Sequence, residues 1–366
     1  MRRKLLIGAA AVALAALTLA GCSTGRSGGG DSGPIKKGDT VGVALPQKTS
    51  ANWVLAKKSF EDALKKAGFK ADVRYTSDSG GVPDQQRTVS NMVTQKYKVI
   101  IVAAQDGSQL GTQVAAAKQA GSTVIAWDRN ITGTKNVDYY VAFNNFKVGQ
   151  LQAQALLDGM KAKKPSGPYN IELFAGASTD ANAGVFFDGA MSVLDPKIKD
   201  GTLKVVSGQT DFQQVQTDNW DKGNAQKRMS NLITAHYSDG TVLDGVLSPN
   251  DQLALGILTA TKAAKLPTPI VTGQDSELDA ITRVVRGEQY STIYKNTDEE
   301  AQAAVDLVSD LAAGKTPKTV NDDKTNSGNG KKIVPYVPLT PILITKENAV
   351  KEYANNPEME AAAKQG

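Results

Sequence analysis

Polar side chains follow most of the short apolar segments in this 366-residue chain. The segment ends read AAQDG, AWDRN, AFNN, AGASTDAN, SPND, TGQDSE and YKNTDE. Asp128 and Arg129 form the pair least typical of a turn, and Asn250, Asp275 and Lys295 add further charged or planar groups. Such groups suit vicinal hydroxyls, because each hydroxyl both donates and accepts hydrogen bonds. A single segment end of this kind is better explained as a turn or a helix N-cap. The prediction of a binding site therefore depends on the presence of seven such ends in one chain.

Two of the three tryptophans begin helix-like segments just after an expected strand end. These are Trp53 in TSANWVLAKK and Trp220 in QTDNWDKGNAQ, whereas Trp127 lies within a strand. Core packing is the ordinary explanation for a tryptophan. The alternative is a stacking platform, because a pyranose has two apolar C–H faces that two aromatic rings can sandwich while polar groups hold its rim. We interpret the two tryptophans as walls of a sugar site.

Catalytic and metal chemistry have few candidate residues. His236 is the only histidine and Cys22 the only cysteine, which excludes a catalytic Cys/His pair in the body of the protein. His236 is expected near a helix C-terminus, where a cation is favourable, and a zinc site needs more ligands. We therefore expect no metal and no cofactor. Hydrolysis by carboxylates alone stays open, because the spatial separation of Asp and Glu side chains is not visible in a sequence.

The N-terminal segment is typical of an exported protein. Arg2, Arg3 and Lys4 precede an uncharged, mostly apolar run from Leu5 to Ala20, which is a signal-peptide pattern. No later segment offers the roughly 20 uncharged apolar residues that a membrane span requires. We expect residues 1–21 to be a signal peptide and the protein to act outside the cytoplasm.

The residues LAGC at 19–22 resemble a bacterial lipobox, which predicts an acylated Cys22 at the mature N-terminus. The Gly/Ser-rich segment 22–37 would then be a flexible tether. The alternative is a plain secretory signal with an incidental cysteine, although a lone exposed thiol is unusual outside the cell. Membrane contact is expected through this lipid anchor only.

Charge gives little indication of a macromolecular partner. The chain carries 42 Lys and Arg against 37 Asp and Glu, and three of the cations lie in the predicted signal peptide, which leaves 39 against 37. No basic tract has interleaved aromatic residues. We expect no nucleic-acid partner.

Short β-branched segments alternate with amphipathic ones along the body of the chain, the rhythm of parallel sheets covered by helices. Strands are expected at 39–46, 71–77, 98–104, 122–128, 139–144, 169–176, 203–209, 243–249, 269–274 and 290–295. Helices are expected at 60–68, 85–96, 111–121, 147–160, 185–194, 225–237, 252–265 and 277–288. Ten strands and a break near 142–146 favour an α/β fold with two doubly wound parallel-sheet lobes over its rival, an eight-stranded barrel. Ligands of such sheets bind beyond the strands' carboxyl ends.

From about Thr40 to Ala349 the chain resembles the type I periplasmic-binding-protein family, in particular the xylose-binding and multiple-sugar-binding proteins of ABC importers. The resemblance rests on VIAWDRN, FNNFKVGQLQA, NIELFAGASTDANA, FFDGAMSVL, VLSPND, TGQDSE, GEQYSTIYK and VPYVPLTPILITKEN. It implies three crossings between the lobes, at about 142–145, 292–296 and 335–340. Lobe one would comprise 38–143 and 296–336, and lobe two 144–295 and 337–366.

The resemblance also implies which side chains hold a sugar. Those carried over by matching motifs are Asp128 and Arg129 from lobe one, Asn250 and Asp275 from lobe two, Lys295 near a hinge, Asp180 and Asn182 after NIELFAG, Asn145 nearby, and Trp53 and Trp220 as stacking rings. Close sugar-binding relatives carry Arg before the first aromatic residue, whereas this chain carries Asn52, so the identity of the sugar is left open.

The implied function is that of a monomeric lipoprotein, not an enzyme, that captures a monosaccharide such as xylose or a related aldopentose or aldohexose. It would deliver the sugar to the permease of an ABC transporter, and a ligand that contacts both lobes would stabilise the closed form. The alternatives are an exported carbohydrate-active hydrolase and a sugar-responsive regulator-like body with a sensory role. The sequence leaves the preferred sugar, the permease and any sensory role undecided.

Overall fold

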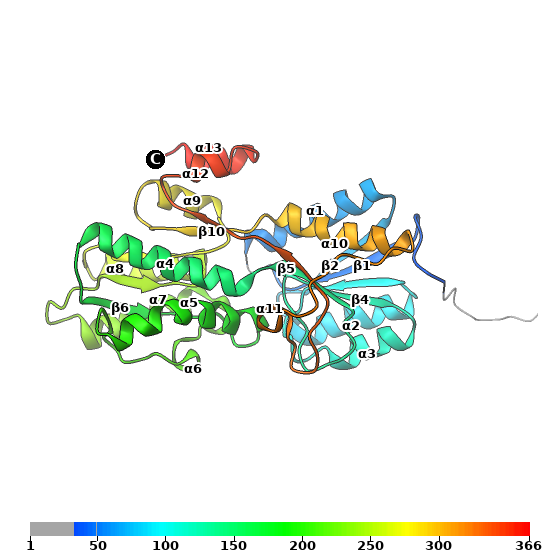
Figure 1. Ribbon diagram of the computed structural model, residues 1–366, viewed down its shortest axis with the longest axis horizontal. Coiled ribbons are helices and arrows are strands. Elements are labelled where there is room, and N and C mark those ends of the chain that lie inside the picture. Colours follow the sequence, from blue (N-terminus) through cyan, green and yellow to red (C-terminus); the bar gives the residue numbers. More distant parts are fainter. Residues whose placement is uncertain (1–32, 49) are drawn as a thin grey trace, which may run out of the picture. The chain divides into compact units, whose positions relative to one another are not determined.

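The structure is a computed structural model that describes residues 33–48 and 50–366 (Figure 1). The predicted signal peptide, Cys22 and most of the predicted tether lie outside the described residues. The described residues from Gly33 onward all belong to one compact unit. None of its helices is both long and apolar enough to cross a membrane.

The first sheet is a six-stranded parallel sheet with the order β11-β5-β4-β3-β1-β2. Its strands are β1 (Thr40–Leu45), β2 (Lys70–Tyr75), β3 (Val99–Val102), β4 (Thr123–Trp127), β5 (Tyr139–Phe143) and β11 (Tyr336–Leu339). The whole of β3, VIIV, is buried, as expected for a strand covered on both faces. Helices α1 (Ala51–Ala67) and α10 (Thr297–Ala312) pack on one face, and α2 (Gly81–Thr94) and α3 (Gly111–Gln119) pack on the other.

The second sheet is a four-stranded parallel sheet with the order β7-β6-β8-β9. Its strands are β6 (Tyr169–Leu173), β7 (Leu203–Val205), β8 (Gly245–Leu247) and β9 (Ile270–Val271). Helices α4 (Asn145–Lys163) and α5 (Ala181–Lys199) pack on one face, and α7 (Lys222–His236) and α8 (Asp251–Ala263) pack on the other. The expected place of His236 near a helix end is confirmed, because it is the last residue of α7.

The remaining elements are short or lie near the ends of the two sheets. They are α6 (Phe212–Val215), η1 (Asp218–Trp220), α9 (Leu278–Val285), α11 (Lys324–Ser327), α12 (Ala349–Glu352) and α13 (Pro357–Ala363). A separate antiparallel pair is formed by β10 (Thr292–Tyr294) and β12 (Ile342–Ile344). The expectation that 290–295 joins a parallel sheet was therefore wrong, because β10 pairs with a late strand that the sequence pattern did not reveal.

The fold class expected from the sequence is confirmed, since helices cover both faces of two parallel sheets (Figure 1). The chain leaves the first sheet after β5, returns to it at α10 and leaves it again after β11. Strands β11 and β12 were missed because Pro335, Pro338 and Pro341 interrupt their sequence. Proline is tolerated in β11 because this strand lies at the edge of its sheet.

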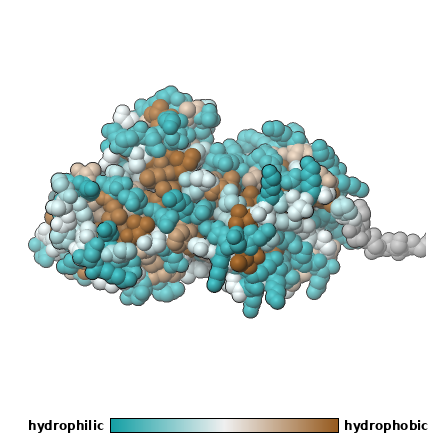
Figure 2. Space-filling model, viewed as in Figure 1, coloured by the Kyte–Doolittle hydropathy of each residue, from teal (hydrophilic) through white to brown (hydrophobic). Residues whose placement is uncertain are grey.

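Polar side chains predominate on the face of the molecule in Figure 2, and hydrophobic residues form separate groups there. The large hydrophobic residues that the described chain exposes are Val54, Val242, Leu278, Val320, Ile333, Ile342 and Val350. Isolated exposed residues of this kind are ordinary on a protein surface. The concentrated polar chemistry lies instead inside the molecule, where the carboxyl ends of the strands meet.

Candidate functional site

One cavity collects side chains from the carboxyl ends of both parallel sheets. Its lining residues are Ser50, Asn52, Trp53, Trp127, Asp128, Arg129, Asp180, Asn182, Phe186, Trp220, Asn250, Gln274, Asp275, Lys295, Thr297 and Glu300. The arrangement follows from the topology, because parallel strands place the residues that follow them at one edge of the sheet. Here two such edges contribute to the same cavity.

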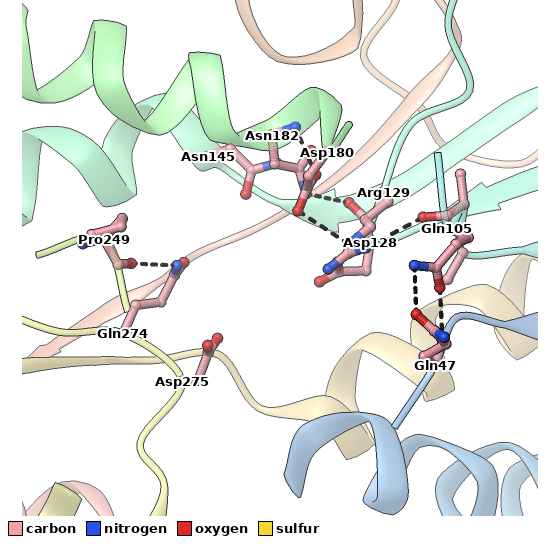
Figure 3. Close-up of polar contacts among 12 residues, drawn as sticks. Gln47, Gln105, Asp128, Arg129, Asn145, Asp180, Asn182, Pro249, Gln274 and Asp275 are labelled. Atoms are coloured by element: carbon pink, nitrogen blue, oxygen red, sulfur yellow. Dashed lines mark hydrogen bonds and ion pairs between the residues drawn. The ribbon is translucent and has the colours of Figure 1, made fainter. Parts of the chain in front are cut away.

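Ten of the eleven predicted site residues line this cavity, and Asn145 does not. Asn145 is buried at the start of α4, where its Nδ2 donates a hydrogen bond to Oη of Tyr140 at 3.3 Å. Tyr140 in turn donates to the backbone oxygen of Asp128 at 2.7 Å, and its Oη lies 3.1 Å from Oδ1 of Asn182. Asn145 therefore supports the lining residues from behind, beside Asn182 (Figure 3).

Lys295 links the two halves of the site through its ammonium group. Its Nζ lies 3.4 Å from Oδ1 of Asp275, which follows β9, and 3.8 Å from Oδ2 of Asp128, which follows β4. Burial alone would lower the pKa of Lys295, but the charges of Asp275 and Asp128 outweigh it and raise that pKa. Burial raises the pKa of Asp128, and Lys295 and Arg129 oppose that effect. The ammonium thus keeps its charge and holds two carboxyl groups in place.

A second ion pair orients Arg129. Its Nε lies 3.1 Å from Oδ2 of Asp180, and both side chains are almost fully buried. The guanidinium carbon lies 5.0 Å from the ring centroid of Trp53, within the range of a cation–π contact. Figure 3 shows Arg129 and Asp180 pointing toward each other. A planar guanidinium fixed in this way presents its remaining N–H groups in a defined direction.

Aromatic rings form two walls of the cavity. Trp53 in the first turn of α1 makes an edge contact with Trp127, with ring centroids 6.1 Å apart. Trp220 in η1 makes an edge contact with Phe186, with centroids 6.4 Å apart. Trp53 also belongs to a hydrophobic cluster, and Trp220 packs against another, so each ring contacts the core and lines the cavity.

Gly176 leaves the space that the Trp220 ring occupies. A Cβ atom at this position would lie 2.1 Å from Cζ2 of Trp220 and 2.2 Å from its Cη2. No other amino acid fits there without moving the ring. The glycine after β6 therefore sets the position of one wall.

Three lining residues adopt the left-handed backbone conformation that non-glycine residues seldom use. The φ angles are 54° for Asp128, 55° for Trp220 and 95° for Asp275, and the neighbours Asn219 and Ser276 have φ of 57° and 52°. Each such residue costs on the order of 1 kcal/mol or more, and they concentrate at functional sites. The surrounding fold holds these side chains in directions that relaxed strand ends would not provide.

Some polar groups of the site also cap helices. The Oδ1 of Asn250 accepts a hydrogen bond from Leu253 N at 2.9 Å, and Oδ1 of Asp180 accepts one from Asn182 N at 2.9 Å. The helix-cap explanation for these residues is thus correct, yet both side chains line the cavity. Asn52, at the position where an arginine was expected from the resemblance, donates through Nδ2 to the backbone oxygen of Asp275 at 3.3 Å.

Two of the seven polar segment ends do not reach the cavity. In AAQDG, Nε2 of Gln105 donates to Oε1 of Gln47 at 3.1 Å (Figure 3). Asp106 closes a local turn by accepting a hydrogen bond from the backbone N–H of Ser108. In AFNN, Asn144 caps α4 by accepting from Lys147 N at 2.8 Å. For these ends the turn and cap explanations account for the polar residues.

Several lining residues were not predicted from the sequence, among them Gln274 and Glu300. Four lining side chains carry a buried polar atom without a hydrogen-bond partner among the described residues. One is Nε of Arg129, which lies in the ion pair with Asp180, and the other three have no ion-pair partner. These three atoms are Nε1 of Trp220, Oε1 of Gln274 and Oε1 of Glu300. The other end of Gln274 is satisfied, because its Nε2 donates to the backbone oxygen of Pro249 at 2.9 Å. Gln274 directly precedes Asp275, which was a usable signal, whereas nothing in the sequence distinguishes Glu300 from Glu299. Buried donors and acceptors without a partner in the wall of a cavity are groups that a polar ligand can satisfy.

Metal coordination has no support in the described chain. Within residues 33–48 and 50–366, no group of three or more His, Cys, Asp or Glu side chains is arranged to hold a metal ion. The arrangement instead combines flat aromatic walls, paired charges and unpaired neutral donors and acceptors. This combination suits a small ligand with apolar faces and several hydroxyl groups.

Comparisons with known proteins agree with this geometry. A family model described as periplasmic binding protein domain matches residues 41–316. The multiple sugar-binding periplasmic receptor ChvE of Rhizobium radiobacter is 47% identical over 317 residues, which cover 85% of this chain and 88% of the relative. The D-xylose-binding periplasmic protein of Escherichia coli (strain K12) is 34% identical over 309 residues, covering 84% and 87%. A solved ABC transporter solute binding protein from Clostridium phytofermentans with bound β-D-glucose has a TM-score of 0.82 and 35% identity, covering 88% of this chain and 100% of that one.

Proposed function

Since this chain belongs to the periplasmic binding protein family, we propose that it captures a monosaccharide outside the cytoplasm and delivers it to the permease of an ABC transporter. The family is one of solute-binding proteins, and its members need no covalent step to carry out this task. The observation that carries the proposal is the single cavity in which Trp53 and Trp220 form walls and charged side chains from both sheets surround them.

The proposed ligand is an aldopentose or aldohexose such as xylose or glucose. The names of the relatives support a sugar of this size, since they include receptors for multiple sugars and for D-xylose and a solved protein with bound glucose. The aromatic walls would contact the apolar faces of the sugar ring, and Asp128, Arg129 and Asp275 would bind its hydroxyl groups. Asn52 replaces the arginine expected from the resemblance, so the range of accepted sugars can differ from that of close relatives.

Binding is proposed to couple to closure of two lobes, one of residues 38–143 and 296–336 and the other of 144–295 and 337–366. Trp53, Asp128 and Arg129 belong to the first lobe, and Trp220, Asn250 and Asp275 to the second. A sugar held by both sets gains more contacts in the closed form than in the open one, and this difference drives closure. The closed form would be the one that the permease recognises.

The protein is further proposed to be a monomer tethered by lipid on Cys22, with residues 22–37 as a flexible spacer. The support is the sequence LAGC after an apolar run and the Gly/Ser-rich composition that follows it. A tether of this kind would hold the sugar-binding body near a membrane-embedded permease.

Isothermal titration calorimetry of the purified protein tests the proposal. The panel would hold D-xylose, D-glucose, D-galactose and L-arabinose, with the open-chain polyol xylitol as a ring-free comparison. We expect at least one of the cyclic sugars to bind with a one-to-one stoichiometry. The absence of binding by every sugar of the panel would contradict the proposal. Incubation with oligosaccharides should release no monosaccharide, and release would favour the hydrolase alternative.

A further inference from the structure

Glu300 is a buried acid on the wall of the cavity with no role in the site as derived so far. It lies in the first turns of α10, its exposed fraction is 3%, and its side chain lines the cavity. The preceding residue on the same helix, Glu299, is exposed. The backbone oxygen of Glu300 accepts a hydrogen bond from Nε1 of Trp127 at 3.0 Å, which fixes this turn of α10 against the end of β4.

The charged groups of the cavity leave Glu300 without a counter-ion. Arg129 pairs with Asp180, and Lys295 lies within 4 Å of both Asp275 and Asp128. Glu300 itself forms no ion pair among the described residues, and no donor there hydrogen bonds to its carboxyl group; Oε1 in particular is fully buried and unpartnered.

A carboxylate in such a place would be costly. Removing an ionised carboxyl group from water without a partner costs several kcal/mol, and the group neutralises instead. Burial raises the pKa of Glu300 well above its usual range; the charges of Asp128, Asp275 and Glu299 raise it further, and Lys295 opposes them. A neutral carboxyl group offers an O–H donor beside a carbonyl acceptor, whereas an ionised carboxylate can only accept hydrogen bonds.

We propose that Glu300 is a further ligand-contacting residue, which donates a hydrogen bond from a neutral carboxyl group to an oxygen atom of the bound sugar. This inference rests on the proposed function and deepens it, because it names a contact to the sugar that the ion-paired side chains of the two proposed lobes do not make. Glu300 contributes to the selection of the sugar, since only a sugar with an oxygen at the facing position satisfies the buried donor. A sugar that lacks this oxygen leaves the donor unpaired and binds more weakly.

Three variants separate the hydrogen bond from charge and shape. Glu300→Gln keeps a donor and an acceptor without ionising, Glu300→Leu keeps similar bulk without polar atoms, and Glu299→Gln removes the exposed neighbouring charge as the matched control. Calorimetry with D-glucose and D-xylose should give Glu300→Gln an affinity within about threefold of the original protein. Glu300→Leu should bind about tenfold more weakly or worse, and Glu299→Gln should bind as the original protein does.

Monodeoxy analogues of the better-bound sugar locate the contact. If Glu300 contacts one hydroxyl group, the analogue that lacks this group should bind more weakly to the original protein but not to Glu300→Leu, for which the contact is already absent. The other analogues should lose affinity equally for both proteins. An equal loss for every analogue would overturn the direct contact, because the effect of Glu300→Leu would then be indirect.

The protonation state is measured independently of affinity by carbon-13 NMR of protein labelled at its glutamate carboxyl carbons. The resonance that disappears in Glu300→Gln should lie at the position of a neutral carboxyl group at pH 7, and Glu299→Gln identifies the resonance of the neighbouring glutamate so that the two are not confused. An ionised Glu300 at pH 7, or Glu300→Gln binding as weakly as Glu300→Leu, would overturn the proposal. Should Glu300→Leu fail to fold, the NMR result and Glu300→Gln still decide it.

The two proposals fail in different ways. If the original protein binds no sugar, the proposed function is wrong, and the assignment of Glu300 as a sugar contact is wrong with it. If the original protein binds sugar and folded Glu300→Leu binds it equally well, only the assignment of Glu300 is wrong.

Discussion

Asp128 and Asp275 follow strands of different sheets, yet both carboxyl groups lie within 4 Å of the same ammonium group, that of Lys295. Both residues also adopt the left-handed backbone conformation, with φ of 54° and 95°. The strained backbone turns the two carboxyl groups toward the cavity, and Lys295 offsets their repulsion. This relationship explains how acidic residues from two separate sheets share one site.

Replacement of Asp275 tests whether both sets of residues hold the same sugar. Asp275→Ala should fold and bind the preferred sugar at least about tenfold more weakly, because a charge-assisted hydrogen bond is worth on the order of 1.5 to 3 kcal/mol. Calorimetry measures the affinity, and Asp279→Ala on the exposed side of α9 serves as the control. Small-angle scattering should show that sugar compacts the original protein and that Asp275→Ala needs far more sugar to compact equally. An unchanged scattering profile for the original protein at saturating sugar would contradict closure.

Gly176 offers a test of the aromatic wall that leaves Trp220 in place. Gly176→Ala should displace the Trp220 ring, because a Cβ atom would lie 2.1 Å from its Cζ2. We expect a loss of sugar affinity in the direction of Trp220→Ala, for which burial of an aromatic face predicts about 1 to 3 kcal/mol.

The matched control for this wall is Gly184→Ala in α5, where a Cβ atom would meet nothing within 4 Å. This variant should bind normally and unfold at an equal or higher temperature, since alanine favours a helix. Calorimetry and tryptophan fluorescence compare the variants. Normal affinity for both Gly176→Ala and Trp220→Ala would mean that Trp220 serves the core alone.

The buried side chain of Glu277 should make the free energy of unfolding depend on pH. Burial, followed by the charge of Asp275, raises its pKa to about 7 from 4.5. The folded protein therefore keeps a proton that the unfolded chain releases, so this group stabilises the fold fully below about pH 4.5 and loses that effect as the pH rises to 7. The free energy of unfolding should thus decrease over this window.

The comparison that isolates Glu277 is denaturant unfolding of the original protein and Glu277→Gln at several pH values. The difference between the two proteins should change by on the order of 2 to 3 kcal/mol between pH 4.5 and 8. A difference that stays constant across this range would show that Glu277 titrates alike in the folded and unfolded states.

The proposed lipid anchor is tested by Cys22→Ala. The variant should leave the membrane fraction of the producing cells and appear in soluble fractions, because the acceptor of the lipid is removed. Sugar affinity, measured by calorimetry on the soluble protein, should not change. Continued membrane association of Cys22→Ala would contradict the lipoprotein proposal.

The alternation of buried strands and amphipathic helices was enough to predict ten of the strands, the α/β class and the two parallel sheets, but not the antiparallel pair of β10 with β12. The reason is that hydrophobic periodicity depends on local sequence, and parallel strands covered on both faces read as short apolar runs such as VIIV in β3. Polar residues at the strand ends could be predicted to share a site for the same reason, since the topology brings such ends together. Where proline interrupts the pattern, as in β11 and β12, this reasoning failed.

Only the tertiary structure decided which polar residues line the cavity. Asn145 and Asn182 both follow strands, yet one lies behind the site and the other lines it, because the difference depends on how α4 and α5 pack. Glu300 and Glu299 are adjacent and chemically alike, but the rotation of α10 against the sheet buries the first and exposes the second. A sequence determines residue types and their local periodicity, whereas the direction of a side chain and the desolvation of its charge are set by contacts between segments far apart in the chain.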